Sequence, residues 1–497
     1  MLESLWNGLL LIFGWPELFY LFIGVCLGLI VGFVPGLGGP AALAIMIPVA
    51  FALSENPVSA LALLLGLHAV TNSGGSVSAI LFGVPGTAPN AATVLDGFEM
   101  AKRGEAGRAI GAALTSSVMG GVIGAFILAL LIPVMRPIVL AFGPAELFFL
   151  TILGLSFLST IGTEEPLKAG VASVLGLLFS FIGQEHLVGS YRYTFNILYL
   201  SDGLPLIPVL LGLFAVSEMV SLLVSRGTIS KVSKTPEHFG NIWQGAKDSF
   251  RNWWLVLRCS ALGSFVGMLP GLGGDVACFI AYGHAAQTSK ESEKFGKGTI
   301  QGVIAPEAAN NAKEGGALFP TLGFGIPGSA GMAILLGVFL ILGLIPGPEM
   351  LSKNLDITFS MVWMVVLANI LAVLILLPLI KYLVKVTFLD GRILAPIIFI
   401  TSIIGAYSAN HNFSDLVIIV VIGVLGYEMK RLNYSRAAFL LGFILGNIAE
   451  RNLFLAYRTR GLEVLMQPSS LVFIVIILIV ISLPIFRYVK KRYYSAS

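Results

Sequence analysis

The chain carries its hydrophobic residues in long runs without charge, rather than in alternation with polar residues. No Asp, Glu, Lys or Arg lies within residues 18–54, 56–95 or 109–135, and similar runs recur up to residue 486. Lipid provides no hydrogen-bond partners for exposed backbone. Because a helix that spans a bilayer needs about 20 apolar residues, the pattern predicts an all-α polytopic membrane protein of about 10 to 13 transmembrane helices. We expect the N-terminus outside and the C-terminus inside.

The composition excludes a soluble protein. The 497 residues have a mean hydropathy of +0.92, and only 11% of them are charged, against roughly 25% in soluble domains. The net charge of +4 is spread over the loops, which argues against nucleic acid as a partner. The three cysteines lie apart in apolar stretches, so neither a disulfide framework nor a zinc site is expected.

Two motifs rich in Gly and Pro each occur twice. The sequence GFVPGLGG at Gly32–Gly39 returns as GMLPGLGG at Gly267–Gly274, and GVPGT at Gly83–Thr87 returns as GIPGS at Gly325–Ser329. The order of the motifs is the same, and the offset is about 235 to 242 positions. Gene duplication within one membrane protein, as in many secondary transporters, is the simplest explanation.

Basic residues indicate how the two copies are oriented. Under the positive-inside rule, the linker from Arg226 to Arg258 and the loop from Lys102 to Arg108 should be cytoplasmic. A basic loop follows the first copy but precedes the second, so the sequence predicts two inverted-topology repeats. The expected organisation is a first repeat at residues 1–110, intervening transmembrane helices at 111–225, a cytoplasmic linker at 226–252, the second repeat core at 253–350 and C-terminal transmembrane helices at 351–497.

The repeated motifs should break helices at the membrane midplane, as half-helices or helical hairpins. Pro lacks an N–H group and Gly tolerates unusual dihedral angles. Free N–H groups at the start of a half-helix bind anions, and free carbonyl groups bind cations. The alternative is that the motifs serve only helix packing or kinks. The expected substrate-binding residues are Gly36, Gly38, Gly39, Asn72, Ser73, Gly74, Gly75, Pro85, Gly86, Thr87, Gly271, Gly273, Gly274, Asn310, Asn311, Pro327, Gly328 and Ser329.

Charged residues within or beside the apolar segments are candidates for ion coupling. These candidates are Asp275, Glu307, Glu164 and Glu165. Each could instead cap a helix or form an ion pair. His68 is expected to be a packing histidine, and Asp96 either a helix cap or a substrate ligand. The sequence shows no nucleophile–base set and no metal-ligand spacing, so we expect neither enzymatic activity nor a cofactor, with Na⁺ as a candidate coupling ion.

Several short segments that occur together carry a family resemblance. They are Gly32–Gly39, Ser73–Ser76, Val84–Gly86, Asp96–Phe98, Gly267–Gly271, Ala305–Glu307, Asn310–Asn311, Gly325–Ser329 and Pro346–Pro348. In this combination, and from about residue 18 to about residue 480, the chain resembles the TctA family, the large membrane subunit of the tripartite tricarboxylate transporters. The resemblance implies import of organic carboxylates through a bacterial inner membrane by Na⁺ or H⁺ symport. It also implies two partners, a small four-span membrane subunit and a periplasmic solute-binding protein.

The chain departs from the family pattern next to the expected site. Family members usually carry Tyr-Gly and a second Tyr before the first Gly-Gly pair, whereas Gly66–Asn72 reads GLHAVTN, with His68, Thr71 and Asn72. The resemblance does not choose among di- and tricarboxylates, sugar acids and aromatic acids. A self-sufficient carboxylate carrier and an anion channel, both without a binding protein, remain alternatives. The duplicated breaks favour alternating access over a channel.

Overall fold

The chain folds into helices joined by loops, as the sequence pattern predicts. The computed structural model describes residues 1–33, 38–160, 165–185, 189–224, 241–270, 273–383 and 391–494. Within these ranges the strands are β1 (Gly183–Gln184) and β2 (Tyr191–Arg192), which pair antiparallel as a hairpin. The other regular elements of the described ranges are helices, which confirms the all-α fold class.

The helices differ widely in length, from single turns to 35 residues. They are α1 (Leu2–Ile12), α2 (Glu17–Phe33), α3 (Gly38–Ala52), α4 (Pro57–Phe82), η1 (Ala88–Asn90), α5 (Ala91–Lys102), α6 (Ala106–Leu140), α7 (Pro144–Thr160), α8 (Pro166–Ser180), η2 (Leu198–Asp202), α9 (Leu206–Leu210), η3 (Leu211–Val216), α10 (Ser217–Val224), α11 (Ile242–Arg251), α12 (Trp253–Met268), α13 (Gly273–Thr288), η4 (Ser292–Lys294), α14 (Gln301–Phe324), α15 (Ala330–Ile341), α16 (Leu355–Leu383), α17 (Gly391–Asn410), α18 (Ser414–Arg431), α19 (Arg436–Arg460), η6 (Gly461–Met466) and α20 (Pro468–Tyr494).

Among the described residues, four helices are long and apolar enough to cross a bilayer by themselves. They are α4, α6, the stretch Leu355–Pro378 of α16 and the stretch Arg436–Thr459 of α19, and α1 with α2 forms a fifth candidate bent by 73°. A further set of apolar helical stretches among the described residues, such as α3, α12, α15 and the stretch Phe399–Ser408 of α17, has 10–17 residues, fewer than the about 20 that a perpendicular span needs. The structure divides the charge-free run 18–54 between α2 and α3. The larger number of spans stays a prediction.

The repeated motifs GVPGT and GIPGS end two long helices in the same way. Helix α4 ends at Gly83 with φ +65° and ψ +16°, and α14 ends at Gly325 with φ +65° and ψ +23°. Glycine adopts this left-handed conformation without the steric cost that a side chain brings. The chain then restarts as η1 and α5 after the first motif and as α15 after the second.

Glycines bring α2 against α4 and α12 against α14. A Cβ added to Gly28 would lie 2.3 Å from the carbonyl oxygen of Leu67, and one added to Gly263 would lie 2.4 Å from that of Ala309. No side chain fits at either place without movement of the backbone. The two carbonyl residues are 242 positions apart, the offset that also separates Asn72 from Glu314. Both helix pairs therefore make the same close contact at matching positions.

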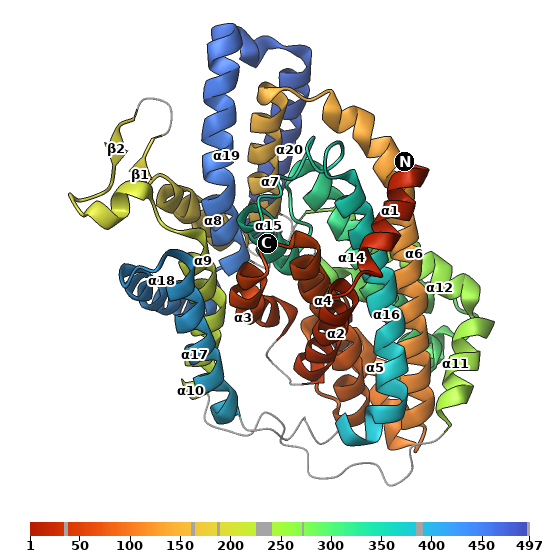
Figure 1. Cartoon of the computed structure of the whole chain (residues 1–497). Helices are drawn as coiled ribbons and strands as arrows, with labels where there is room; N and C mark the ends of the chain where they lie inside the picture. Colours follow the sequence, from red (N-terminus) through yellow and green to blue (C-terminus); the bar gives the residue numbers. More distant parts are fainter. Residues whose placement is uncertain are drawn as a thin grey trace.

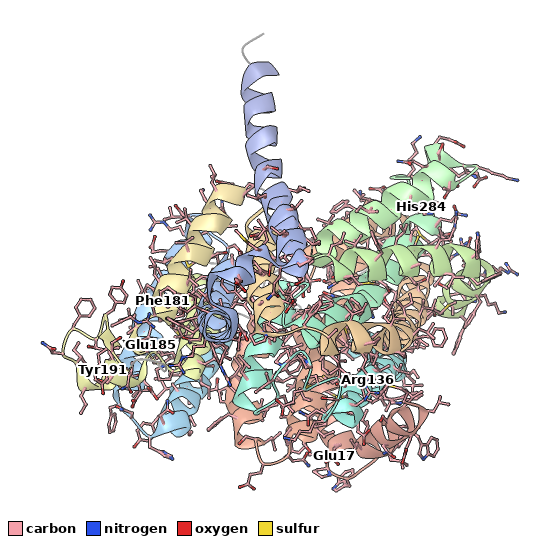
Figure 2. The ribbon with its side chains drawn as sticks, turned by 90° about the horizontal axis from the view of Figure 1, so that it is seen from above. Glu17, Arg136, Phe181, Glu185, Tyr191 and His284 are labelled. Atoms are coloured by element: carbon pink, nitrogen blue, oxygen red, sulfur yellow. The ribbon has the colours of Figure 1, made fainter. Side chains whose placement is uncertain are left out.

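Helices of the two halves also contact each other across the molecule. Helix α1 packs against α16, and α11 packs against α6 (Figure 1). In the same manner α8 packs against α19, and α18 packs against η3 and α10. The β1–β2 hairpin projects from one side in Figure 1. Figure 2, seen from above, places Tyr191 and Glu185 at this edge and His284 of α13 at the opposite one.

Candidate functional site

Helices α4 and α14 carry polar side chains in the interior of the protein. None of these residues is more than 7% exposed. The apolar part of α4 is wholly buried, so these side chains face protein rather than lipid. Burial of a polar or charged group costs free energy unless the group is paired. The residues are His68, Thr71, Asn72, Ser73 and Ser76 on α4, and Glu307, Asn310, Asn311, Lys313 and Glu314 on α14.

The carboxylate of Glu307 lies in a cage of hydroxyl and amide groups. It accepts hydrogen bonds from Ser76 Oγ (3.0 Å), Thr93 Oγ1 (2.5 Å), Ser117 Oγ (2.9 Å) and Asn90 Nδ2 (3.3 Å). These donors come from α4, α5, α6 and η1, so the cage joins these four elements to α14. Within the described ranges no Lys, Arg or His forms an ion pair with this carboxylate. The charge is therefore balanced by neutral donors alone.

The end of the GVPGT motif and the residues after it form hydrogen bonds back to α4. Thr87 Oγ1 lies 2.9 Å from Asn72 Oδ1 and 2.5 Å from Asn90 Oδ1. Asn90 Nδ2 donates to the carbonyl oxygen of Asn72 (3.0 Å) and also reaches Glu307. The break after α4 is thus linked to the Glu307 cage through two asparagines.

A charged trio lies one to two helical turns from Glu307. Glu314 Oε1 lies 2.6 Å from Lys313 Nζ, and Glu314 Oε2 lies 3.1 Å from His68 Nε2. Asn72 Nδ2 donates to Glu314 Oε1 at 3.5 Å. His68 is buried as expected, but it pairs with Glu314 and is not a satisfied packing histidine. The ion pair joins α4 to α14 between residues far apart in the sequence.

Two asparagines of α14 retain unused hydrogen-bonding capacity. Asn311 Nδ2 donates to Ser73 Oγ (3.0 Å) and to Asn369 Oδ1 (2.5 Å), whereas its Oδ1 has no partner among the described residues. Asn310 is 0% exposed, and neither of its amide atoms has a partner in the described ranges. A buried polar group left unpaired costs about 1–3 kcal/mol. A bound solute or ion would remove this cost.

A family model fits this chain over most of its length. Residues 18–441 match the tripartite tricarboxylate transporter TctA family. The chain belongs to this family. It is therefore a transport protein of the membrane, in agreement with its apolar helices.

Two relatives of this TctA-family chain come from Agrobacterium vitis. An uncharacterised 52.8 kDa protein of the TAR-I ttuC' 3' region is 35% identical over 432 residues, which cover 87% of this chain and 85% of the relative. An uncharacterised protein of the TAR-II ttuC' 3' region is 39% identical over 191 residues, which cover 38% of this chain and 79% of the relative. No solved structure matches the chain.

Several residues that the sequence nominates lie together in this TctA-family chain. Asn72, Ser73 and Thr87 of the first repeat and Glu307 and Asn311 of the second belong to one connected set of contacts. Asn310 lies on the same helix within one turn of Asn311. Residues Gly38 and Gly39 begin α3, Gly273 and Gly274 begin α13, and Ser329 Oγ caps α15 at Met332 N.

The glycines of the motifs make close backbone contacts. The N–H of Gly86 donates to the carbonyl oxygen of Gly75, and a Cβ on Gly86 would lie 2.2 Å from the carbonyl oxygen of Gly32. A Cβ on Gly328, the matching residue, would lie 2.4 Å from the carbonyl oxygen of Gly267. A Cβ added to Gly74 would lie 2.6 Å from the carbonyl oxygen of Leu29 in α2, and one added to Gly75 would lie 2.2 Å from Asn90 Oδ1. Pro85 directly precedes Gly86, and Pro327 directly precedes Gly328.

Other candidates lie apart from the cluster or outside the described ranges. Glu165 is on the surface, with its side chain 47% exposed, and pairs with Lys168 at 2.9 Å, the alternative role that the sequence left open. Asp96 is no helix cap, because it lies inside α5. Its carboxylate instead accepts bonds from Tyr282 Oη, Gly296 N, Gly298 N and Thr299 N. Outside the described residues are Gly36, Glu164, Gly271 and the side chain of Asp275.

Sequence reasoning missed Lys313 and Glu314 as members of the cluster, and Asn90, Thr93 and Ser117 as partners of Glu307. A signal was present for the first two, because charges within a helix that is otherwise apolar and rich in small residues mark functional positions. The hydroxyl and amide partners carry no such signal, since Ser, Thr and Asn are ordinary in membrane helices.

Proposed function

We propose that this chain is the large permease subunit of a secondary transporter that imports organic di- or tricarboxylates by symport with Na⁺ or H⁺. The family match supports the transporter subunit. The single observation that carries the finer proposal is the buried polar cluster at the contact between α4 and α14, where two broken helices adjoin. Transporter sites lie in such places, near the midplane and between repeats.

The two halves act in this proposal as inverted repeats. The helix contacts support this arrangement. Helix α1 of the first half packs against α16 of the second, and α11, which precedes α12 as α1 precedes α2, packs against α6. The matching close approaches of α2 to α4 and of α12 to α14 support this arrangement as well. Movement of one core unit against the rest would then expose the polar cluster to each side in turn.

The substrate carboxylate binds among Asn72, Ser73, Asn310 and Asn311, with N–H groups from the helix starts that follow the motifs. The amide atoms of Asn310 and the Oδ1 of Asn311, which have no partner among the described residues, support this assignment. Amide and hydroxyl groups orient a polar solute without fixing it by charge, which permits release on the far side. The interior holds the carboxylates of Glu307 and Glu314 against the ammonium of Lys313, so a cation that enters with the anion offsets the excess negative charge.

The coupling cation is assigned to Glu307. The oxygens of Ser76, Thr93 and Ser117 around its carboxylate are the ligand type that a hard cation prefers, and the same carboxylate can take a proton. Asp275 remains a second candidate because it follows the second PGLGG motif. No other cofactor is proposed.

The partners are a small four-span membrane subunit and a solute-binding protein on the outer face of the bacterial inner membrane, with the N-terminus outside and the C-terminus inside. The tripartite family supports partner subunits. The polar linker at 226–252, basic in sequence, faces the cytoplasm in this assignment. The residues of the linker up to 240 lie outside the described ranges.

The test is uptake of labelled carboxylates into proteoliposomes that hold this chain with its small subunit. Sodium and proton gradients are applied separately, with and without the binding protein. Gradient-driven accumulation that requires the binding protein supports the proposal and names both substrate and ion. Accumulation without the binding protein indicates a self-sufficient carrier, and single-channel currents indicate an anion channel.

A further inference from the structure

We infer that His68 is a substrate-binding residue that receives a carboxylate group, and that Glu314 occupies this position in the structure described here. The inference rests on the proposed function, and it names the side chain that recognises the anion. The family resemblance does not provide it, because the chain departs from the family pattern at His68 itself.

His68 lies between the first turns of two helices that begin after Gly/Pro motifs. A Cβ added to Gly39, the second residue of α3, would lie 3.3 Å from His68 Nδ1. A Cβ added to Gly331, the second residue of α15, would lie 2.2 Å from His68 Cε1. The start of a helix carries free N–H groups and partial positive charge, both of which favour an anion. One imidazole thus touches the two helix starts that come from different repeats.

The imidazole has capacity for a ligand. His68 is 6% exposed, and neither ring nitrogen makes a hydrogen bond among the described residues, although Nε2 lies 3.1 Å from Glu314 Oε2. Either ring nitrogen can carry the donor N–H. A carboxylate oxygen at this place would accept that N–H and lie beside the helix starts.

The contacts of Glu314 allow a substrate carboxylate to replace it beside His68. Its Oε1 accepts from Lys313 Nζ and from Asn72 Nδ2, whereas Oε2 lies at ion-pair distance from His68 Nε2, 3.1 Å, and has no hydrogen-bond partner in the described ranges. A substrate carboxylate can therefore take the place of Oε2 at His68 while Lys313 and Asn72 keep the other oxygen. Without substrate, the carboxylate of Glu314 lies beside His68 Nε2, where the substrate carboxylate would bind.

The matching position in the second repeat narrows the class of substrate. Asn310 corresponds to His68 at the offset of 242 positions that relates Asn72 to Glu314. Both of its amide atoms are buried, and neither has a partner in the part of the chain that the structure describes. An amide donates and accepts, so it suits a hydroxyl or a second carboxyl group. The two positions together favour an acid that carries a hydroxyl or a second carboxyl group besides the carboxylate at His68.

The test measures binding, so that it does not depend on transport. The full chain in nanodiscs is titrated with succinate, malate, tartrate and citrate, of which the first three form a series of rising hydroxyl content. Dissociation constants are compared for wild type, His68→Leu, His68→Gln and the control His284→Leu, which lies at the far edge of the molecule in Figure 2. His284 Nε2 is also buried and has no hydrogen-bond partner among the described residues, so the control is matched in that respect.

We expect His68→Leu to weaken binding about 10- to 100-fold, the loss of one hydrogen bond to a charged group. His68→Gln should fall between it and wild type, and His284→Leu should equal wild type. Glu314→Gln should bind more tightly, because it removes the competing carboxylate, whereas a merely structural His68–Glu314 pair predicts no gain.

A dissociation constant for His68→Leu within about twofold of wild type overturns the inference. If that variant does not fold, His68→Gln decides, and wild-type affinity in it overturns the inference too. Failure of all four acids to bind wild type also overturns it. Uptake by the assembled system then shows separately whether the proposed function survives.

Discussion

Asn72 of α4 and Glu314 of α14 occupy matching positions in the two halves of the chain, 242 residues apart, and their side chains meet with Nδ2 3.5 Å from Oε1. Two matching residues can touch only where the duplicated segments face each other. The polar cluster around them, with Glu307 on one side and His68 and Lys313 on the other, therefore lies at the contact between the halves. That is where a movement of one half against the other would change the site most.

The close approach of Gly86 to the backbone of Gly32 should be essential for stability and uptake. Gly86→Ala places a Cβ 2.2 Å from the carbonyl oxygen of Gly32, and such overpacking costs about 1–3 kcal/mol. We expect a lower melting temperature and lost uptake. The matched control is Gly283→Ala in α13, where an added Cβ meets nothing within 4 Å. Gly283→Ala should melt no lower than wild type, since Ala favours a helix by about 0.5–1 kcal/mol over Gly. Equal melting of wild type and Gly86→Ala would disprove the tight packing.

Glu307 should couple transport to the ion gradient. Glu307→Gln keeps the size of the side chain and removes the charge that the hydroxyl cage surrounds. We expect gradient-driven accumulation to fall at least about tenfold, the loss of one charged hydrogen-bonding partner, while exchange of labelled for unlabelled substrate persists.

Glu165→Gln is the control for Glu307, because Glu165 is exposed and its pair with Lys168 is of the surface type that contributes about 0–1 kcal/mol. It should accumulate substrate as wild type does. Unchanged ion dependence in Glu307→Gln would assign the coupling to another residue.

Asp96 should hold the loop before α14 against α5. Its carboxylate accepts bonds from Tyr282 Oη (2.8 Å), Gly298 N (2.7 Å) and Thr299 N (2.8 Å). Asp96→Asn cannot accept all of them, and the loss should be about 2–4 kcal/mol, since each bond to a charged group contributes about 1.5–3 kcal/mol. Hydrogen exchange should accelerate at Gly298 and Thr299. Wild-type protection there would show that the loop is held by other contacts.

Tyr199 should make the free energy of unfolding fall at alkaline pH. Burial, and then the hydrogen bond to Asp415, raise the pKa of Tyr199 well above its usual value, which is about 10. Because the pKa of Tyr199 is higher in the folded than in the unfolded state, its contribution to the free energy of unfolding is fully present below about pH 10. That contribution is lost as the pH rises toward the folded-state pKa. Tyr199→Phe should remove this part of the alkaline decline. The check is the difference in melting temperature between variant and wild type from pH 8 to pH 11, and a constant difference would contradict the assignment.

The sequence predicts much of this architecture because its signals are local. Charge-free runs identify helices, and the motifs at Gly83 and Gly325 place two helix ends that the structure has in nearly the same conformation. The sequence nominates Asn72, Ser73 and Asn311 from their nearness to the motifs; Ser73 contacts Asn311, and Asn72 contacts Thr87 and Glu314.

The side-chain contacts that the sequence does not predict are those set by how the helices cross. His68 and Glu314 lie far apart in the chain, and only the register of α4 on α14 brings Nε2 to Oε2. The role of Asp96 likewise depends on a loop 200 residues away. The number of spans escapes prediction for a different reason, because composition marks a run as apolar without showing where Gly and Pro divide it.

The central claim is that substrate binds at the contact of α4 with α14, and protection of a cysteine at Asn310 tests it most directly. Asn310→Cys is made in a chain whose Cys26, Cys259 and Cys278 are replaced by Ala, and its reaction with a thiol reagent is followed with and without a carboxylate that the system transports. We predict that saturating substrate slows the reaction at least about tenfold. A carboxylate that is not transported should leave the rate unchanged. Equal rates with and without transported substrate, or a cysteine that never reacts during turnover, would contradict the account.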